Sequence, residues 1–551
     1  MLVMAFAGIF RLLPSWQSLL LAFLSAFLLI LSFPDFEYWV LAWVAFVPLL
    51  AAIEREKSST VRSFLIGWAF GTTFFLGTCW WLTYSMIRYG QLPPLAAYFL
   101  LLLICLIVGL FPAIFAACMS VIVRRFGGVG FLTVPFVWVA SELLRYWLSG
   151  NNWNAVAYSQ SLGGWGLALA SIGGIYLTGF TILTFQSAAV AAYLVRFPVL
   201  LGTRSPGDEG LVKKSGVASA PALIACLSCA VVLTVLVLFG AKPATRAKTE
   251  STPAALIATI QPNVPMSGLN YEIWIQLRSR HVELAEAALD KLKKEFPQDT
   301  SVPTTVIFPE SPMNFMYEDD PEFQEFVHDF NTKHNVDLLF NSAEPNRDDG
   351  KYFNSAVLTD KTGNEIAQYD KIHLVPFGEA VPGPFEGIVP ALVGSFSYGS
   401  RYQLMPFGDA KAGVVLCYES AFGDLSREMV KRGADVLIEM TNDGYLGPTP
   451  VLRQHLAHAV FRAVETNRPL LRTTNVGIGG YITEQGEILN ATKPYTEDIR
   501  VWPVMKSDGS QTFYVKYGDW FAWLCGAITL GILITAFANK PNYAEELKAV
   551  S

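Results

Sequence analysis

Long apolar blocks with short polar breaks fill the first 240 residues of the chain, and another apolar block covers residues 519–538. A helix needs roughly 20 mostly apolar residues to cross the hydrocarbon layer of a bilayer. The pattern therefore predicts membrane-spanning helices at residues 17–33, 38–53, 64–84, 95–123, 129–147, 165–195, 217–240 and 519–538. We expect a membrane α-helical bundle of about eight spans, seven of them before the polar linker 241–252.

Short apolar runs alternate with longer amphipathic runs between residues 253 and 505. The strand-like runs are 254–261, 304–308, 337–341, 355–359, 411–416, 436–440 and 470–473. The helix-like runs are 274–296, 322–334, 422–432 and 449–466. Such interleaving predicts an extramembrane α/β domain with strands for two sheets or one large sheet. A connector (506–518), the last span and a tail (539–551) would complete the chain.

Composition supports a membrane protein. Hydrophobic residues make up 52% of the chain and charged residues 16%, and the mean hydropathy is +0.37. The net charge of −6 comes without a basic stripe, which argues against a nucleic-acid partner. A cleaved signal peptide is an alternative for residues 1–33, but no small-x-small cleavage site follows and further spans do.

Lysine and arginine residues fall in alternate loops between the predicted spans. One side receives Arg11, Arg55, Lys57, Arg62, Arg124, Arg125, Arg196, Arg204, Lys213, Lys214, Lys540 and Lys548. By the positive-inside rule this side faces the cytoplasm, so both termini are expected there. The segment 241–518 is then expected on the far side, in the periplasm if the protein resides in a bacterial inner membrane.

One of the seven cysteines, Cys417, lies in the polar part of the chain, directly after the apolar run 412–416. The remaining six lie in apolar blocks: Cys79, Cys105, Cys118, Cys226, Cys229 and Cys525. A lone thiol in an oxidising compartment has no disulfide partner there, so its presence indicates reactivity. The alternative is a small buried hydrophobe at a strand end, which is a common fate of free cysteine.

Glu310 and Lys371 accompany Cys417 as polar residues near apolar strand-like runs. Ligands and catalytic groups of α/β folds gather beyond the carboxyl ends of strands. A carboxylate beside a thiol can take its proton and return it to a leaving group, and an ammonium can stabilise the oxyanion that forms. Taken singly, Glu310 could instead cap a helix and Lys371 could be a solvated lysine.

Three short segments resemble the Glu-Lys-Cys triad of the nitrilase superfamily. They are 308–311 (Phe-Pro-Glu-Ser), 369–373 (Tyr-Asp-Lys-Ile-His) and 416–419 (Leu-Cys-Tyr-Glu). Supporting segments are 261–265, 374–379, 441–445 and 472–475. With many spans before such a domain and one after it, nearly the whole chain resembles the apolipoprotein N-acyltransferase family.

The resemblance implies an α/β/β/α sandwich on a membrane platform and a two-step reaction without cofactor or metal. Cys417 would attack the sn-1 ester of a phospholipid such as phosphatidylethanolamine and form a thioester. The α-amino group of the diacylglyceryl-modified N-terminal cysteine of an apolipoprotein would then accept the acyl chain. This ping-pong transfer would be the last step of lipoprotein maturation, carried out by a monomer.

The same resemblance implies roles for single residues. Glu310 would be the general base and acid, and Lys371 the oxyanion donor. Glu379 and Glu419 match further acidic residues around the thiol, although acids near a lysine often serve only as its ion-pair partners. Tyr418, beside the thiol, is a candidate for substrate binding.

Histidines and one loop leave other possibilities. His455 and His458 are three apart on a predicted helix, a spacing that suits two metal ligands, but no third ligand motif lies nearby. His373 suggests a rival Cys-His mechanism; the spacing permits it, and the family resemblance argues against it. The apolar loop 385–398 is expected to dip into the outer leaflet, or alternatively to be buried under the domain.

Two other functions compete with acyl transfer. A membrane-tethered amidase or nitrile hydrolase would use water as the acceptor, but seven spans would be superfluous for a soluble substrate. A channel or transporter with a soluble sensor would be favoured by charges inside the spans. The main such charges, Glu142 and Arg145, lie near the outer end of their span.

Overall fold

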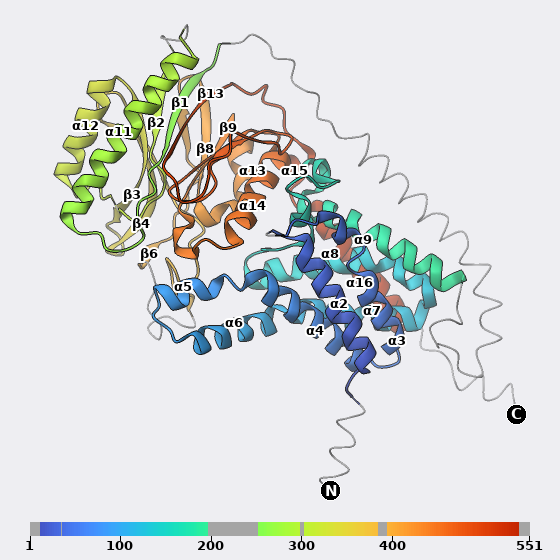
Figure 1. Ribbon diagram of the computed structural model, residues 1–551. Helices are drawn as coiled ribbons and strands as arrows, with labels where there is room; N and C mark the ends of the chain where they lie inside the picture. Colours follow the sequence, from blue (N-terminus) through green and yellow to red (C-terminus); the bar gives the residue numbers. More distant parts are fainter. Residues whose placement is uncertain are drawn as a thin grey trace, which may run out of the picture.

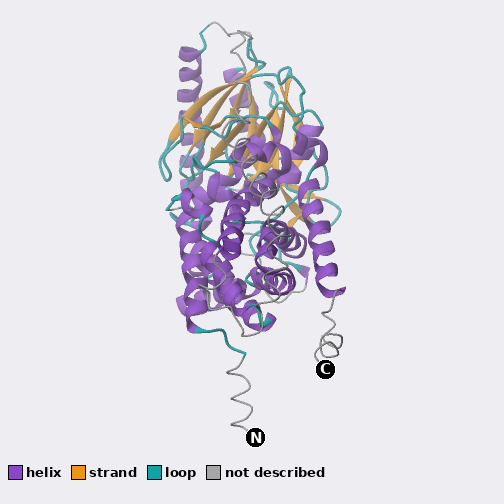
Figure 2. Cartoon of the chain, turned by 90° about the vertical axis from the view of Figure 1, so that its right-hand side faces the viewer, coloured by secondary structure: helices purple, strands orange, loops and turns teal. Residues whose placement is uncertain are grey.

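The computed structural model describes residues 12–34, 36–196, 252–297, 302–313, 315–383 and 394–538. These residues form a helical part and an α/β part. The two parts are neighbours, and the strands of the α/β part lie at one end of the molecule (Figures 1 and 2). The helical part contains α2 (Trp16–Ser32), η1 (Trp39–Trp43), α3 (Val47–Glu56), α4 (Thr60–Cys79), α5 (Leu82–Arg88), α6 (Pro94–Val108), α7 (Leu110–Phe126), η2 (Gly127–Thr133), α8 (Val134–Ser149), η3 (Val156–Gln160), η4 (Leu167–Leu169), α9 (Ala170–Arg196) and α16 (Trp520–Ala538).

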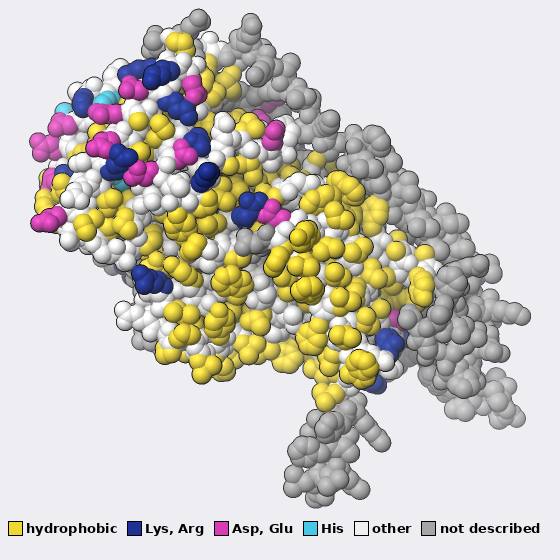
Figure 3. All heavy atoms as spheres, viewed as in Figure 1, with side chains coloured by type: hydrophobic (Ala, Val, Ile, Leu, Met, Phe, Trp, Pro, Cys, Tyr) yellow, Lys and Arg dark blue, Asp and Glu magenta, His cyan; other side chains and the backbone are white. Residues whose placement is uncertain are grey.

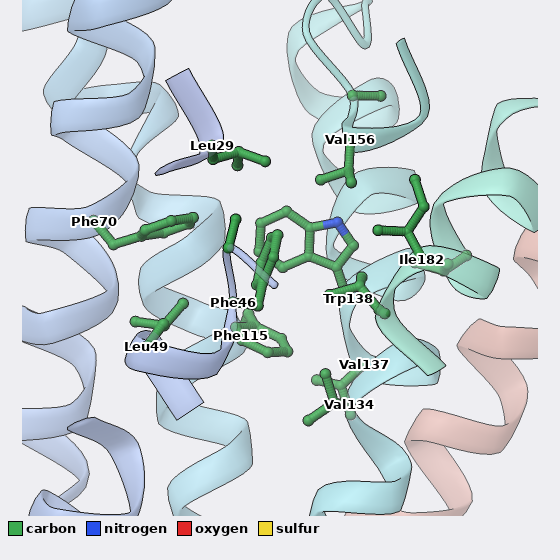
Figure 4. Close-up of a cluster of buried hydrophobic side chains, with 14 of the residues drawn as sticks. Leu29, Phe46, Leu49, Phe70, Phe115, Val134, Val137, Trp138, Val156 and Ile182 are labelled. Carbon is green, nitrogen blue, oxygen red and sulfur yellow. The ribbon is translucent and has the colours of Figure 1, made fainter. Parts of the chain in front are cut away.

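Trp138 of α8 lies at the centre of the helical part (Figure 4). Its ring meets Phe46 at 4.6 Å, Phe115 at 5.1 Å and Phe70 at 6.3 Å between centroids, each in an edge-to-face arrangement. Edge-to-face pairs are favourable because the positive ring edge meets the negative ring face. These aromatic contacts bring α4, α7 and α8 together around the segment between η1 and α3.

Helices α4 and α7 approach closely because α4 carries two glycines on the contact face. A Cβ atom added at Gly67 would lie 2.4 Å from the carbonyl oxygen of Pro112, and one at Gly71 would lie 2.7 Å from the Pro112 ring. Small residues four positions apart commonly allow such close packing between membrane helices. The glycines therefore determine the spacing of this helix pair.

The predicted count of eight spans is not confirmed. Within the described ranges, Pro94–Ser149, Leu167–Leu194 and Trp520–Ala538 are long and apolar enough to cross a membrane, and Thr60–Cys79 with Leu82–Arg88, bent by 56°, would be a fourth. The predicted span 38–53 is wrong as a single helix. It forms η1 and the ten-residue α3, which at 1.5 Å per residue extends only about 15 Å. The predicted span 217–240 lies outside the described residues.

On the face shown in Figure 3, apolar side chains cover most of the helical part, whereas charged side chains gather on the α/β part. On α6, Leu95 is 85% exposed and Ile107 is 64% exposed. Apolar surface on this scale is unusual for a protein surrounded by water alone. The distribution is compatible with insertion of the helical part into a membrane.

The α/β part contains two sheets. Its strands are β1 (Ala255–Gln261), β2 (Thr304–Ile307), β3 (Asp337–Asn346), β4 (Lys351–Thr359), β5 (Glu365–Asp370), β6 (Phe396–Ser397), β7 (Leu404–Phe407), β8 (Ala410–Leu416), β9 (Val436–Thr441), β10 (Leu470–Thr474), β11 (Gly480–Ile482), β12 (Ile488–Leu489) and β13 (Asp498–Val504). The first sheet has the order β13-β1-β2-β3-β4-β5, with β6 beside β4, and the second β12-β11-β10-β9-β8-β7. Both have a parallel centre, β1-β2-β3 and β8-β9-β10.

The sheets face each other through a shared apolar core, to which Ile257 and Leu339 of one sheet and Val414 and Ile438 of the other contribute. Helices α11 (Tyr271–Glu295) and α12 (Pro321–His334) pack against the outer face of the first sheet. Helices α13 (Gly423–Lys431) and α14 (Val451–Thr466) accompany the second. The predicted α/β class is confirmed, and the layers follow the order α/β/β/α.

Every predicted strand and helix of this part is present, with ends shifted by a few residues. The sequence pattern missed β5, β6, β7 and the strands after β10, which are short or carry polar residues. Strand β5, for example, has exposed and partly buried residues among its buried ones, because it lies at the edge of its sheet. This strand matters because it ends immediately before Lys371.

Gln454 of α14 joins the two parts of the molecule. Its Oε1 accepts hydrogen bonds from the indoles of Trp81 (3.1 Å) and Trp153 (3.0 Å), and its Nε2 donates to the carbonyls of Pro34 and Thr78. A buried amide whose donors and acceptor are all used is costly to displace. The helical part thereby holds one end of α14.

Candidate active site

Cys417 directly follows β8 and is the first residue of the short helical turn η6 (Cys417–Ala421). Its φ is +51°. A positive φ is uncommon for residues other than glycine, and such strained positions cluster at functional sites. The abrupt change from strand to turn presents the thiol at the carboxyl end of the parallel centre of the second sheet.

Lys371 follows β5 and is fully buried. Its Nζ lies 2.8 Å from Oε1 of Glu379 and 3.6 Å from Oε1 of Glu310. Burial disfavours the ammonium, but the two carboxylates outweigh it and raise the pKa of Lys371. The lysine is therefore a fixed positive charge beside both carboxylates.

Asn354 of β4 connects the same two carboxylates. Its Nδ2 donates to Oε1 of Glu379 at 2.7 Å and to Oε1 of Glu310 at 3.0 Å. The backbone N–H of Asn442 donates to the other Glu310 oxygen at 3.1 Å. Sequence reasoning missed Asn354, although a polar residue next to the strand-like run 355–359 was a usable signal.

The thiol of Cys417 and the carboxyl of Glu310 lie beside each other, close enough for each group to affect the pKa of the other. Burial, and then the Glu310 charge, raise the pKa of Cys417, while Lys371 acts in the opposite direction. Burial also raises the pKa of Glu310 against the opposing effect of Lys371. A carboxyl with a raised pKa beside a thiol is suited to accept a proton and return it.

Glu419 is also buried, but its oxygens are used for holding the backbone. Oε1 accepts from Tyr369 (2.8 Å) and from the N–H groups of Ile372 (2.7 Å) and His373 (3.1 Å), and Oε2 accepts from Leu416 N–H (2.8 Å). Burial raises the pKa of Glu419 to about 7 despite these donors. The side chain ties the segment after β5 to the end of β8.

Tyr418 points toward the helical part. Its hydroxyl is hydrogen-bonded by Asn151 and its ring stacks on Trp153 at 6.3 Å between centroids. Both contacts belong to the loop after α8. Sequence reasoning missed this loop as a neighbour of the thiol, since nothing in the local pattern links it to a turn more than 250 residues away.

Glu142 and Arg145, the charges near the outer end of a predicted span, hold the same loop. Arg145 Nη1 donates to the carbonyl of Trp153 at 2.9 Å, and Glu142 Oε1 accepts from the N–H of Val156 at 3.1 Å. Their role in the fold is thus to shape the loop that contacts Tyr418. The loop 385–398 lies mostly outside the described residues.

The three histidines that the sequence left open lie in different surroundings. His373 stacks on Phe422 at 3.9 Å, with the ring planes 2° apart. His455 contacts the Cys417 carbonyl oxygen, whereas His458 lies between the rings of Trp153 and Tyr158. Across the described ranges, no group of three or more His, Cys, Asp or Glu side chains has the geometry of a metal site.

Comparisons with known proteins agree with the two-part structure. Residues 25–188 match the family of the apolipoprotein N-acyltransferase N-terminal domain, and residues 298–507 match the carbon-nitrogen hydrolase family. An apolipoprotein N-acyltransferase of Geobacter metallireducens is 31% identical over 95% of either chain. The chain belongs to the apolipoprotein N-acyltransferase family. It is accordingly an N-acyltransferase whose α/β part has the nitrilase-like fold.

Other relatives are more distant but equally extensive. The apolipoprotein N-acyltransferase of Allorhizobium ampelinum is 27% identical over 89% of this chain and 90% of its own, and that of Haemophilus influenzae is 25% identical over 90% of both. Among solved structures, an amidase from Nesterenkonia sp. is 15% identical, with a TM-score of 0.35 over 48% of this chain and 94% of its own.

Proposed function

We propose that the protein transfers an acyl chain from the sn-1 position of a phospholipid, such as phosphatidylethanolamine, to the N-terminal diacylglyceryl-cysteine of apolipoproteins. The observation that carries the proposal is the position of the Cys417 thiol beside the carboxyl of Glu310 and the buried ammonium of Lys371. The membrane helices beside this site supply the reason for a lipid donor. The names of the relatives supply the reason for a lipoprotein acceptor.

In the first step, Glu310 takes the proton of the Cys417 thiol as the sulfur attacks the ester carbonyl. The carbonyl oxygen becomes an oxyanion, which the ammonium of Lys371 stabilises. When the C–O bond breaks, Glu310 returns the proton to the glycerol oxygen, and a lysophospholipid leaves. The products of this step are a Cys417 thioester and a Glu310 carboxylate ready for a second cycle.

In the second step, the neutral α-amino group of the acceptor attacks the thioester carbonyl. Glu310 takes one proton from the attacking amine, and Lys371 again stabilises the oxyanion. The C–S bond breaks, the proton passes from Glu310 to the sulfur, and an amide leaves the site. Glu379 and Asn354 keep Lys371 and Glu310 in place through both steps.

The proposal includes a location and a domain organisation. The α/β domain (253–505) would lie in the periplasm of a bacterium with an inner membrane, and both termini in the cytoplasm, because lysine and arginine alternate between loops. Residues 1–240 would form the membrane domain, with a further span at 519–538. The enzyme would act as a monomer.

Hydrolysis is the second candidate, since the carbon-nitrogen hydrolase match covers the domain that carries Cys417. In a hydrolase, water would replace the amine and release a free fatty acid or a carboxylic acid. Tyr418, which would border the acyl group, is held by Asn151 and Trp153 of the helical part. A site built jointly with apolar helices favours a lipid donor over a soluble amide.

The deciding experiment incubates the purified protein with phosphatidylethanolamine vesicles in the absence of acceptor and measures the intact mass. A hydroxylamine-labile acyl adduct on the wild type, absent from Cys417→Ser, supports the proposed first step. Addition of a diacylglyceryl-cysteine peptide should then discharge the adduct and acylate the peptide. If neither an adduct nor free fatty acid forms, the mechanism is wrong; fatty acid without peptide acylation would indicate hydrolysis.

A further inference from the structure

Two buried side chains of helix α14, His455 and Arg462, point toward η6, the short helical turn that begins with Cys417. Nε2 of His455 lies 2.9 Å from the carbonyl oxygen of Cys417. Two turns later, Nη1 of Arg462 donates to the carbonyls of Ser420 (3.4 Å) and Ala421 (3.3 Å). Residues seven apart lie on the same face of a helix. One face of α14 therefore holds the carbonyl groups at both ends of η6.

The ring of His455 has hydrogen-bond acceptors on both sides. Nε2 faces the Cys417 carbonyl and, at 3.1 Å, a Glu439 oxygen, while Nδ1 lies 2.6 Å from Oδ1 of Asp443. Carbonyl and carboxylate oxygens accept but do not donate, so each ring nitrogen must carry a hydrogen to satisfy its neighbour. The hydrogen-bond pattern thus requires the doubly protonated, positively charged ring.

Arg472 also approaches Nδ1, at 3.2 Å, but two donors cannot bond to each other. The arginine instead donates to the second Asp443 oxygen at 2.9 Å and pairs with Glu439 at 2.5 Å. The two carboxylates therefore each lie between the histidine and the arginine. All four side chains are at most 2% exposed.

The groups around His455 come from strand β9 (Glu439), strand β10 (Arg472), the first residue of the turn η7 (Asp443–Leu446) and η6 (Cys417), with His458 on its own helix. Burial opposes the charge on His455, and so does Arg472, but the two carboxylates raise its pKa to about 9. Burial holds the pKa of His458 well below the usual value. The cluster is electrically neutral only while His455 is protonated.

We propose that His455 is a positioning residue for the nucleophile: its imidazolium holds the carbonyl of the strained Cys417 and balances the carboxylates behind it. A hydrogen bond from a charged donor is about twice as strong as a neutral one, which suits a residue held at positive φ. The charge matters separately, because Asp443 raises the pKa of the Cys417 thiol. The inference rests on the proposed role of Cys417.

The test measures alkylation of Cys417 by iodoacetamide between about pH 6 and pH 10 in the full-length protein in detergent micelles. Peptide mass spectrometry separates the Cys417 adduct from adducts of the other cysteines. His455→Gln retains a neutral donor, and His455→Leu removes it. His458→Gln is the matched control, since His458 is equally buried on the same helix and its ring nitrogens have no hydrogen-bond partner among the described residues.

We expect the alkylation rate at neutral pH to fall about threefold to tenfold in His455→Gln, with its midpoint moved to higher pH, since the cation behind the thiol is lost. The rate for His455→Leu should be lower by at least about a further tenfold across all pH values, since the neutral donor that glutamine retains is then lost as well. His458→Gln should keep the wild-type midpoint. The proposal would be overturned if the wild type and His455→Gln had equal pH profiles. It would also be overturned if His455→Gln and His458→Gln moved the midpoint of alkylation by the same amount.

A second measurement covers the case in which His455 variants do not fold. In wild-type protein labelled with ¹⁵N-histidine, one imidazole should retain hydrogens on both nitrogens at about pH 8, above the usual histidine pKa of about 6.5. If every histidine is neutral at that pH, the proposal is wrong. Neither measurement uses phospholipid or acceptor, so a failure of the acyl-transfer proposal leaves both outcomes interpretable.

Discussion

Lys371 and Glu379 form a buried ion pair in which Nζ lies 2.8 Å from Oε1, closer than the 3.6 Å that separates the lysine from Glu310. The lysine is thus neutralised mainly by Glu379 rather than by Glu310, the carboxylate beside the thiol. Glu310 remains available for proton transfer because Glu379 serves as the principal counterion. Glu379, which the sequence resemblance placed in a supporting role, thereby supports Glu310, the proposed general base.

Replacing Glu379 by Gln should slow thioester formation at neutral pH by about tenfold or more, the range in which a positioned base contributes. The Glu379 charge helps to raise the pKa of Glu310, and its loss also drives Lys371 toward Glu310. Glu310 becomes a weaker base, and the acid limb of the rate profile moves to lower pH. The measurement is adduct formation over time by intact mass.

A suitable control for this change is Glu344→Gln. Glu344 of β3 is buried and accepts from the N–H groups of Tyr317 and Glu318, outside the candidate site. Its replacement should lower the melting temperature without moving the pH profile. Identical profiles for the wild type and Glu379→Gln would refute the counterion role.

Replacing Glu419 by Gln should destabilise the protein by about 1–3 kcal/mol, the cost of leaving buried donors unpaired. Both carboxylate oxygens accept from N–H or O–H groups, so either orientation of the amide places its NH₂ against a donor. Thermal unfolding followed by circular dichroism measures the effect. Tyr369→Phe removes one of the four donors and should lower the stability by less. An equal or larger loss of stability would contradict the role of Glu419 in linking the ends of β5 and β8.

The hydroxyl of Tyr418 and the amide of Asn151 should be energetically coupled. A double-mutant cycle of Tyr418→Phe and Asn151→Ala should give a coupling of about 1 kcal/mol, because their shared bond can be lost only once, while the separate bond from Trp153 N–H to Asn151 cancels in the cycle. The readout is the free energy of unfolding. Strictly additive effects would mean that the loop after α8 does not hold the residue beside the thiol.

Gly67→Val should weaken the contact between α4 and α7 by about 1–3 kcal/mol, the usual cost of overpacking. Even the Cβ atom would lie 2.4 Å from the Pro112 carbonyl oxygen, and backbone atoms cannot move aside cheaply. The melting temperature in detergent measures the change. Gly531→Val on α16 is the control, since no atom lies within 4 Å of its added Cβ. Equal effects at both sites would exclude close packing as the cause.

The stabilising contribution of His455 should depend on pH. Its folded-state pKa of about 9 lies above the unfolded value of about 6.5, so the contribution is complete below about pH 6.5 and is lost as the pH rises through about 9. The shift corresponds to at most about 3 kcal/mol. The difference in unfolding free energy between wild type and His455→Gln should therefore shrink over this interval.

The matching control for this pH dependence is His458→Gln. Burial keeps His458 neutral throughout the same interval, because it holds the pKa of that ring well below its usual value. Its variant should differ from the wild type by a constant amount. A constant difference for His455→Gln as well would show that the ring of His455 does not carry the charge that its acceptors require.

The sequence by itself determined the α/β class and most of its elements, because apolar runs bounded by turns translate directly into buried strands. It also indicated Glu310 and Cys417, since each comes directly after an apolar run that marks a strand, whereas Lys371 was indicated by the segment 369–373 that resembles a nitrilase motif. It did not predict β5, because this strand at the edge of the sheet exposes Ile366 and contains too few apolar residues to form an apolar run. The apolar composition of 38–53 wrongly predicted a single spanning helix, because it gave no sign of the break between η1 and α3.

Only the tertiary structure decided which side chains meet. Asn354, Asn151 and His455 reach the candidate site from a strand, a loop between membrane helices and a helix of the second sheet. Their contacts span tens to hundreds of residues, and local periodicity carries no information on such distances. The charge on His455 likewise depends on the acceptors that β9 and η7 place around its ring, because burial alone would have favoured the neutral form.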